Sequence, residues 1–217
     1  MSPSMDNRGM HSTIAVIDFE TTGMTPAQGA RATEVAIVLV QNGQVVDRFQ
    51  SLLRTGVWIP PFITQLTGIT NAMVAEAPAA EGVMRDAARF VGDAPMVAHN
   101  AAFDAKFWTH ELTHADVPAP HAFACTVLLS RRLYPEATSH KLGNIVQHLG
   151  LPRAARAHRA LADAEMAASL LTRMQQDLRT HWRVENPGHA LLSTLQRCAK
   201  PKVGKLLADY ATPQLVA

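Results

Sequence analysis

The sequence predicts an α/β fold in which helices flank a mixed five-stranded sheet. Apolar, β-branched segments open the chain at residues 13–18, 34–40 and 44–53, and two shorter ones follow at 95–98 and 122–126. Helical patterns separate the later segments. A group of strands followed by alternating helix and strand indicates a mixed sheet with helices packed on it.

The first three strands are expected to be antiparallel. The first is an apolar run that ends in the carboxylate of Asp18, and the sequence at residues 22–26 then breaks the strand as a loop. The second and third are joined by Asn42-Gly43. This pair is a strong hairpin signal, because both central residues of a type I′ turn need φ > 0.

Helices are expected between and after the strands. Pro60-Pro61 begins a short helical stretch that closes near Gly68, and longer helices are predicted at residues 79–91 and 101–112 and up to about residue 133. The helix at residues 141–149 ends before Gly150. The strongest helical pattern covers residues 160–179, with an apolar stripe made of Leu161, Ala164, Ala168, Leu171 and Met174.

Composition limits the classes of protein that this chain can be. Its 217 residues allow one sizeable core, and a net charge of +2 excludes a polybasic nucleic-acid arm. Two widely spaced cysteines, Cys125 and Cys198, favour a reducing, cytoplasmic location over a disulfide scaffold. No apolar run is long enough to span a bilayer, so no membrane partner is expected.

Three regions are expected along the chain. Residues 1–12 are polar and are predicted to be disordered, and residues 13–180 form the folded domain. Residues 181–217 carry five Lys or Arg against two Asp or Glu, and Lys200, Lys202 and Lys205 cluster there. We expect this segment to be a basic, partly helical tail outside the core.

Two carboxylates lie at the end of the first strand. Side chains two residues apart on a strand point to the same face, so Asp18 and Glu20 project together. Burying both is unfavourable unless a counter-charge such as a divalent cation neutralises them. The alternative is a solvated strand end with two ordinary surface acids.

Two further acids lie near helix starts. Asp104 can be a metal ligand or a charge that complements the helix dipole. Asp163 lies in the first turns of the last long helix, five residues after His158. A histidine titrates near neutral pH and can therefore accept a proton from an attacking water. Taken alone, an exposed loop histidine is the simpler interpretation, because the chain has ten histidines.

The loop before Asp104 carries other candidates. His99 and Asn100 can serve as helix caps or can hydrogen-bond a phosphate or sugar. Phe103 and Phe107 fit the core better than a base-stacking role.

Together these segments resemble the DEDDh family of 3′–5′ exonucleases, which includes the proofreading (epsilon) subunit of bacterial DNA polymerase III. The resemblance covers residues 13–174, and its motifs occur in the family's order. They are Asp18-Phe19-Glu20-Thr21-Thr22-Gly23-Met24, Leu66-Thr67-Gly68-Ile69, His99-Asn100-Ala101-Ala102-Phe103-Asp104, Lys141-Leu142 and His158-Arg159-Ala160-Leu161-Ala162-Asp163-Ala164.

The resemblance implies a ribonuclease H-like fold, two Mg²⁺ or Mn²⁺ ions and release of nucleoside 5′-monophosphates. It implies that His158 is the general base and that the metal ligands are Asp18, Glu20, Asp104 and Asp163. It also implies that the 3′-terminal nucleotide is bound by Thr21, Thr22, Gly23, Met24, Leu66 and Thr67, to which we add His99, Asn100 and Phe103 as candidates. Plain packing is the alternative for Met24 and Leu66.

The expected substrate is a nucleic acid with a free 3′ end, in the first instance single-stranded or frayed DNA, in proofreading or repair. Basic residues at positions 131–159 form the candidate surface for the phosphate backbone, namely Arg131, Arg132, Lys141, Arg153, Arg156 and Arg159. The basic tail is a candidate contact for a polymerase or repair complex. RNA as the substrate, or a non-catalytic binding or scaffold role, remains an alternative.

Overall fold

The computed structural model describes residues 13–153 and 158–211. Within them, a five-stranded sheet has the order β3-β2-β1-β4-β5. The strands are β1 (Ile14–Thr21), β2 (Ala32–Gln41), β3 (Gln44–Leu52), β4 (Met96–Ala98) and β5 (Phe123–Cys125). Strands β1 to β3 pair antiparallel, and β4 and β5 join in parallel. The predicted mixed sheet with an antiparallel start is confirmed.

Helices connect and cover the strands. Those before β5 are the 3₁₀ turn η1 (Pro26–Gln28), α1 (Pro61–Thr67), α2 (Asn71–Ala75), α3 (Ala80–Val91) and α4 (Ala101–His114). Those after it are α5 (Thr126–Leu133), α6 (Leu142–His148), α7 (Ala160–Trp182), α8 (His189–Leu195), η2 (Lys200–Lys202) and α9 (Val203–Ala211). The five-residue helix α2 was not predicted, because so short a helix shows no periodic pattern.

The turn between β2 and β3 follows the sequence expectation. Asn42 and Gly43 have φ of 55° and 76°, the left-handed values that a type I′ turn requires.

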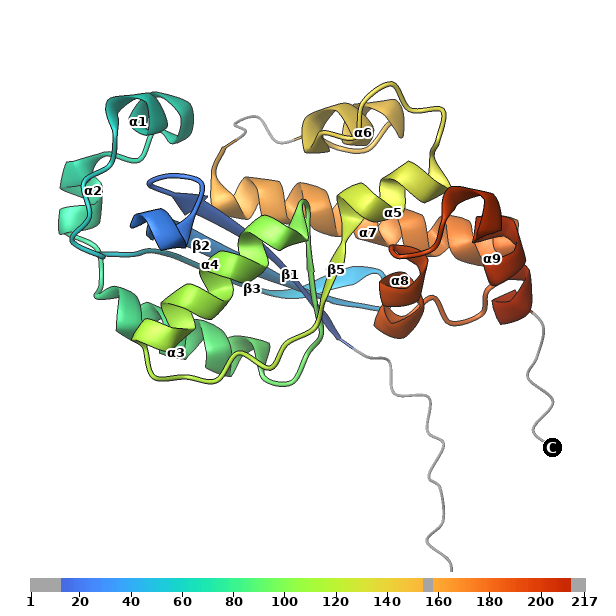
Figure 1. Ribbon diagram of the computed structural model, residues 1–217, viewed down its shortest axis with the longest axis horizontal. Coiled ribbons are helices and arrows are strands. Elements are labelled where there is room, and N and C mark those ends of the chain that lie inside the picture. The colour runs from blue at the N-terminus through green and yellow to red at the C-terminus, as the bar shows by residue number, and fades with distance from the viewer. Residues whose placement is uncertain (1–12, 154–157, 212–217) are drawn as a thin grey trace, which may run out of the picture.

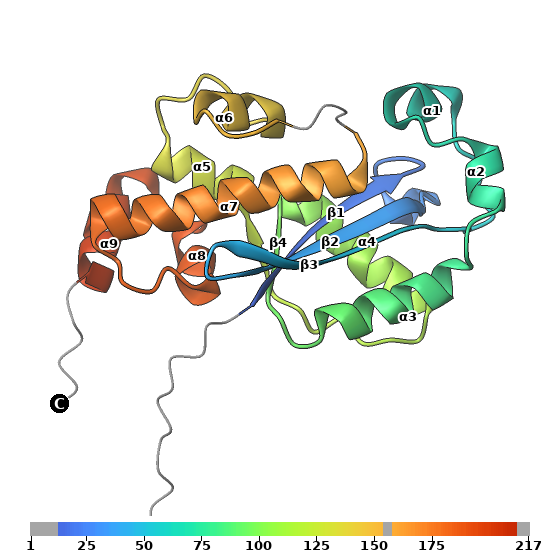
Figure 2. The ribbon, with the colours of Figure 1, turned by 180° about the vertical axis from the view of Figure 1, so that it is seen from behind.

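Each face of the sheet is covered by its own hydrophobic core. Along β1, Ala15, Ile17 and Phe19 face a core shared with α3 and α4, whereas Ile14 and Val16 face a core shared with α7. Figures 1 and 2 show α7 on one side of the sheet and α3 with α4 on the other. By alternation, Asp18 and Glu20 belong to the face that α7 covers.

The C-terminal segment is partly helical as expected, but its prediction as a tail outside the core is wrong. Four leucines of α8 and α9 are fully or almost fully buried in the core on the α7 side, namely Leu191, Leu192, Leu195 and Leu207. Val203 of α9 is buried in the same core.

A glutamine fixes this segment to the edge of the sheet. The side chain of Gln196 accepts a hydrogen bond from the Cys125 amide at 2.7 Å and donates one to the Phe123 carbonyl at 3.2 Å. It thereby occupies hydrogen-bonding groups on the free edge of β5, which edge strands otherwise expose.

The expected disorder of residues 1–12 concerns residues outside the described part of the chain. In that part, no helix is both long enough and apolar enough to cross a membrane.

Candidate active site

The end of β1 contributes two of the predicted carboxylates. Asp18 is half-buried and Glu20 is only 9% exposed, and the ladder places Glu20 directly opposite Glu34 of β2. The strand extends to Thr21, three residues beyond the predicted end. The backbone ladder with β2 continues although the apolar pattern stops at Asp18.

The third carboxylate, Asp104, lies in the first turn of α4 and is 2% exposed. The Phe19 amide of β1 donates a hydrogen bond to its Oδ1 at 3.3 Å. Phe107, one turn further along α4, is fully buried, with its ring centroid 6.4 Å from that of Phe19. The aromatic contact therefore holds α4 against β1 and brings Asp104 to the end of the strand.

The start of α7 completes the cluster. Glu20, His158 and Asp163 each offer a ligand atom, and these atoms lie within 4.8 Å of one another. The His158 amide donates a hydrogen bond to Asp163 Oδ2 at 3.2 Å, and its backbone is left-handed with φ of 59°. Because this bond fixes the backbone of His158, its exposed ring is held beside the carboxylates.

Burial, with repulsion between neighbouring carboxylates, raises the pKa values of all four acids above their ordinary range. Burial, followed by repulsion from Asp163 and Glu34, raises the pKa of Glu20 to about 8. Burial is also the main cause that raises the pKa of Asp104 to about 8. The pKa of Asp18 is raised well above its ordinary value, first by burial and then by repulsion from Asp104. The pKa of Asp163 is raised as well, again by burial.

This set of donors suits hard divalent cations. Mg²⁺ and Mn²⁺ prefer carboxylate oxygens, and a cation near the cluster would favour the charged form of every acid in it. The residues present therefore fit a metal site.

Sequence reasoning missed the ion pair that anchors this site. Glu34 is 1% exposed and binds Arg159 at 2.6 Å, and it also accepts hydrogen bonds from the Ala160 amide and from Gln50. Burial acts to raise the pKa of Glu34, but the hydrogen bonds from Arg159 and Ala160 outweigh it, so the pKa is lowered. The only signal was an acid within an otherwise apolar strand.

The loop after β1 is shaped by its own threonines. The Thr21 hydroxyl donates to the Gly23 carbonyl at 2.7 Å, and Thr22 exchanges two hydrogen bonds with the backbone of Arg31. Both threonines are buried, whereas Met24 is 73% exposed. The threonine side chains therefore act on the loop itself, and Met24 is free to contact a substrate.

Gly23 and the opposite end of the loop are also constrained. A Cβ at Gly23 would lie 3.4 Å from the Ala30 side chain, so the loop is closely packed there. Arg31 forms a bidentate ion pair with buried Glu111 of α4, with a shortest distance of 2.8 Å. This pair ties the loop to the helix that carries Asp104.

The two predicted contacts on α1 differ in exposure. Leu66 is 51% exposed and available to a substrate. Thr67 is 2% exposed, donates its hydroxyl to the Ile63 carbonyl and accepts a hydrogen bond from the Ile69 amide. Direct substrate contact by Thr67 is therefore not supported, because its hydroxyl already closes the end of the helix.

His99 is likewise occupied within the protein. Its Nδ1 lies 2.8 Å from the Thr126 hydroxyl and its Nε2 lies 3.0 Å from the His140 carbonyl. Burial lowers its pKa to about 4, so the ring is neutral at physiological pH. With both nitrogens paired, His99 holds β4, α5 and the loop before α6 together, and the interpretation as a substrate contact is not supported.

Asn100 and Phe103 remain candidates. Asn100 occupies the N-cap position of α4 with φ of 79°, but its exposed side chain forms no capping hydrogen bond and is free. Phe103 is half-buried with its ring centroid 4.9 Å from that of Phe107. Phe107 is core, as expected, and Phe103 presents only part of its ring.

The predicted basic surface is smaller than expected. Arg159 binds Glu34, and Arg132 donates to the Cys198 and Leu128 carbonyls. Arg131, Lys141 and Arg153 are exposed, and Arg156 lies outside the described residues. Inward-facing arginines cannot be told from outward-facing ones by sequence spacing alone.

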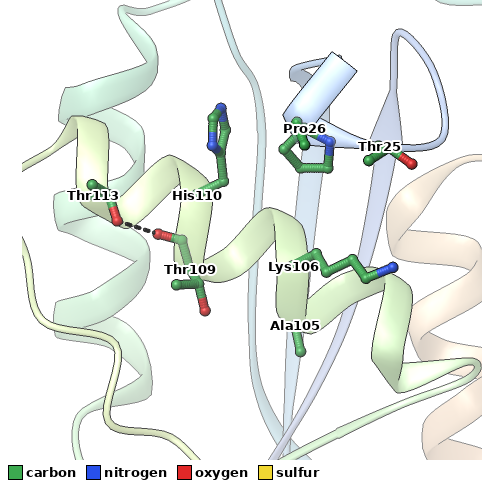
Figure 3. A pocket seen from close by; sticks show the side chains of 8 residues that line it. Thr25, Pro26, Ala105, Lys106, Thr109, His110 and Thr113 are labelled. Atoms are coloured by element: carbon green, nitrogen blue, oxygen red, sulfur yellow. Dashed lines mark hydrogen bonds between the residues drawn. The ribbon is translucent and has the colours of Figure 1, made fainter. Parts of the chain in front are cut away.

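A cavity of about 610 Å³ lies along α4, the helix that carries Asp104. Figure 3 shows its walls, formed by side chains of α4 and of the turn at Thr25 and Pro26. Lys106 and His110 line it, two and six residues after Asp104, but none of the cluster's carboxylates does. The cavity is therefore separate from the carboxylate cluster.

Comparison with known proteins agrees with this geometry. The exonuclease family model matches residues 15–171. The DNA polymerase III subunit epsilon of Aquifex aeolicus (strain VF5) is 32% identical over 82% of this chain and 87% of its own length. The 3′–5′ exonuclease DinG of Bacillus subtilis (strain 168) is 37% identical over 76% of this chain.

A solved structure of Exonuclease X in complex with 5′ overhanging duplex DNA is also similar. It is 28% identical with a TM-score of 0.65, and the match covers 84% of this chain and 99% of that one. By contrast, the chain spans only 18% of the length of DinG and 12% of the PolC-type DNA polymerase III of Clostridium perfringens (strain 13 / Type A). The family match spans the positions of all four carboxylates and of His158, and the chain therefore belongs to the exonuclease family, with a fold of the 3′–5′ exonuclease type.

Proposed function

We propose that this protein is a metal-dependent 3′–5′ exonuclease that hydrolyses the terminal phosphodiester bond of DNA and releases nucleoside 5′-monophosphates. One observation carries the proposal. Four carboxylates from β1, α4 and α7 gather with raised pKa values beside an exposed histidine. A protein that only binds nucleic acid gains nothing from this concentration of buried acids, so a scaffold role is disfavoured.

Each residue has a distinct part in the reaction. Asp18, Glu20, Asp104 and Asp163 would hold two divalent ions, with Mg²⁺ and Mn²⁺ as candidates. When bound, such ions stabilise the charge on the attacking and leaving oxygens. His158 accepts the proton of the attacking water, and its exposed ring beside Asp163 suits that task.

Met24 and Leu66 hold the terminal nucleotide. Both are large, apolar and exposed, at 73% and 51%. Apolar side chains of this kind contact any base face without reading sequence. The substrate is therefore a single-stranded or frayed 3′ end of any sequence.

DNA is proposed as the nucleic acid because the relatives named above are DNA polymerase subunits and exonucleases, one of them bound to duplex DNA. The test uses matched DNA and RNA oligonucleotides labelled at the 5′ end, each with Mg²⁺, Mn²⁺ or EDTA. A ladder that shortens from the 3′ end of DNA only, and only with metal, is expected. Faster digestion of RNA would overturn the choice of substrate.

Two variants test the mechanism, with a third as a control. Asp18→Ala and His158→Ala should abolish release of mononucleotides, whereas His181→Ala, an exposed histidine in the last turn of α7, should not. Wild-type activity in either of the first two purified variants would refute the assigned roles.

We propose that the enzyme works beside a polymerase, as the match to an epsilon subunit suggests. Because α8 and α9 pack into the core, a docking surface in this region must lie on the exposed side of the segment, where Lys202 of η2 and Lys205 of α9 lie. Charge reversal of both lysines should weaken co-purification with the replicative polymerase and leave nuclease activity intact. Unchanged co-purification would place the contact elsewhere.

A further inference from the structure

Two histidines stand one turn apart at the end of α4. The chain has ten histidines, and His110 and His114 are its only two that are three or four residues apart. Residues four apart project from the same side of a helix. The structure agrees, because the centroids of the two imidazole rings are 4.5 Å apart. The end of α4 therefore presents a pair of imidazoles on one side.

The rings are held so that nitrogen lone pairs are available. His114 Nδ1 lies 2.9 Å from the His110 carbonyl oxygen. A carbonyl can only accept a hydrogen bond, so Nδ1 carries the proton and Nε2 of the neutral ring keeps its lone pair. Histidines that bind metals are oriented in the same way, by donating their other ring N–H to a carbonyl or carboxylate. Within the described residues, no protein group hydrogen-bonds a ring nitrogen of His110.

The surroundings of the pair leave it accessible. His114 is exposed, and His110 is half-buried in the wall of the cavity along α4. Figure 3 shows the His110 ring projecting away from the helix, clear of the side chains of Thr109 and Thr113. Burial, followed by the neighbouring His114, lowers the pKa of His110. Because the neutral imidazole is the form that binds a metal, no proton has to leave this ring first.

Imidazole selects a different class of metal ion from the carboxylate cluster. Zn²⁺, Cu²⁺ and Ni²⁺ suit imidazole, whereas Mg²⁺ and Mn²⁺ prefer carboxylate and water. Two histidines at positions i and i+4 of one helix are spaced to hold a single zinc ion between them. The carbonyl groups left free at the C-terminal end of a helix also favour a cation there.

We propose that His110 and His114 form a second metal site, which binds Zn²⁺ or another late first-row divalent ion, with water in the remaining positions. The site is separate from the carboxylate cluster, so this inference does not depend on the proposed nuclease function. An ion held by both rings would fasten the end of α4. Glu111, between the two histidines in sequence, anchors the loop after β1 there through its ion pair with Arg31.

The test measures Zn²⁺ binding by isothermal titration calorimetry, with excess Mg²⁺ to compete at the carboxylate cluster. His110→Gln and His114→Gln should each weaken binding of one Zn²⁺ equivalent at least tenfold, since loss of even an outer-shell partner typically costs about 10–100-fold in metal affinity. His181→Gln, an exposed histidine in the last turn of α7, is the matched control and should bind Zn²⁺ as the wild type does. Zn²⁺ should also raise Tm of the wild type more than Tm of the first two variants.

Cu²⁺ provides a spectroscopic test that does not rely on the stability of these variants. The carboxylate cluster contains one histidine, His158, whereas the proposed site contains two. Electron paramagnetic resonance should therefore show two imidazole nitrogens on one Cu²⁺ in the wild type and also in His158→Gln. The same signal should be absent from His110→Gln.

Two results would overturn the inference. One is unchanged Zn²⁺ affinity in both His110→Gln and His114→Gln. The other is a wild-type protein in which no Cu²⁺ carries more than one imidazole nitrogen, because the carboxylate cluster would then be the only site occupied. Neither measurement uses nuclease activity, so failure of the proposed function would leave both results interpretable.

Discussion

Replacing Arg159 with methionine tests the ion pair at the start of α7, in which Glu34 is buried and the Arg159 side chain is 27% exposed. The change leaves the carboxylate of Glu34, 1% exposed, without its cationic partner. Removing one member of a buried pair typically costs about 3–5 kcal/mol. Glu34 keeps hydrogen bonds from Gln50 and Ala160, so we expect the lower value, about 3 kcal/mol.

The expected loss is measurable by thermal unfolding. For a chain of this length, 1 kcal/mol corresponds to about 2–4 °C, so Tm of Arg159→Met should fall by roughly 6–12 °C. Nuclease kcat should fall by roughly 10- to 100-fold, because the neighbouring His158 would shift from its place beside Asp163. Circular dichroism and oligonucleotide digestion measure the two effects separately.

A second ion pair of equal length provides the control. Arg48 binds Glu165 at the same distance, 2.6 Å, but these side chains are 50% and 44% exposed. An exposed pair contributes about 0–1 kcal/mol, so Arg48→Met should barely change Tm. Equal losses in the two arginine variants would show that burial is not the source of the stabilisation.

The double variant and the pH dependence sharpen the argument. Glu34→Gln combined with Arg159→Met should be more stable than the sum of the single losses predicts. Because the folded pKa of Glu34 is lowered, its stabilising contribution is present above its unfolded pKa, about 4.3, and is lost as pH falls through the folded pKa. The difference between wild type and Arg159→Met should therefore narrow in acid.

Three other predictions follow from buried polar groups. The pKa values of Glu20 and Asp104 are raised to about 8, so the metal-free protein should lose stability as pH rises from about 4 through 8. Mg²⁺ should raise Tm more at pH 9 than at pH 6. A Tm of the metal-free protein that increases from about pH 4 to pH 8 would contradict the raised pKa values of these acids. Gln196→Ala should lower the free energy of unfolding in urea by about 1–3 kcal/mol, because backbone groups of β5 lose their partners. Thr194→Ala removes only a solvent-exposed hydrogen bond from a half-buried residue of α8 and should cost less than about 1 kcal/mol. Equal losses in the two variants would argue against capping of the sheet edge by Gln196. His99 has a pKa lowered to about 4, so the wild type should lose stability as pH falls from about 6.5 toward 4. His99→Gln should not show this loss of stability in acid. Identical stability–pH profiles for the two proteins would contradict a buried, neutral His99 ring.

The sequence predicted the elements whose signals are local. Alternating and apolar runs located all five strands, and Asn42-Gly43 located the hairpin turn. The five catalytic candidates could be named because their motifs occur in a family's order. The structure brings them to the edge of the sheet where β1 ends, but their roles remain proposals.

Other features depend on contacts between distant residues. Glu34 and Arg159 are 125 positions apart, and no periodic pattern relates them. The leucine spacing of α8 indicates a helix but not the strand on which it packs. His99 and Thr67 carry groups suited to a substrate, and only the folded structure shows that protein groups already occupy them.

The four carboxylates come from three elements that are far apart in the sequence, β1, α4 and α7, so they meet only when the chain folds. The cluster is built from contacts of long sequence separation, which form late because a long loop must close first. A partly folded chain, or one whose α7 has detached from the sheet, has lost Asp163 from the cluster and cannot act as a nuclease. The proposed hydrolysis of DNA would thereby be restricted to molecules that have completed folding.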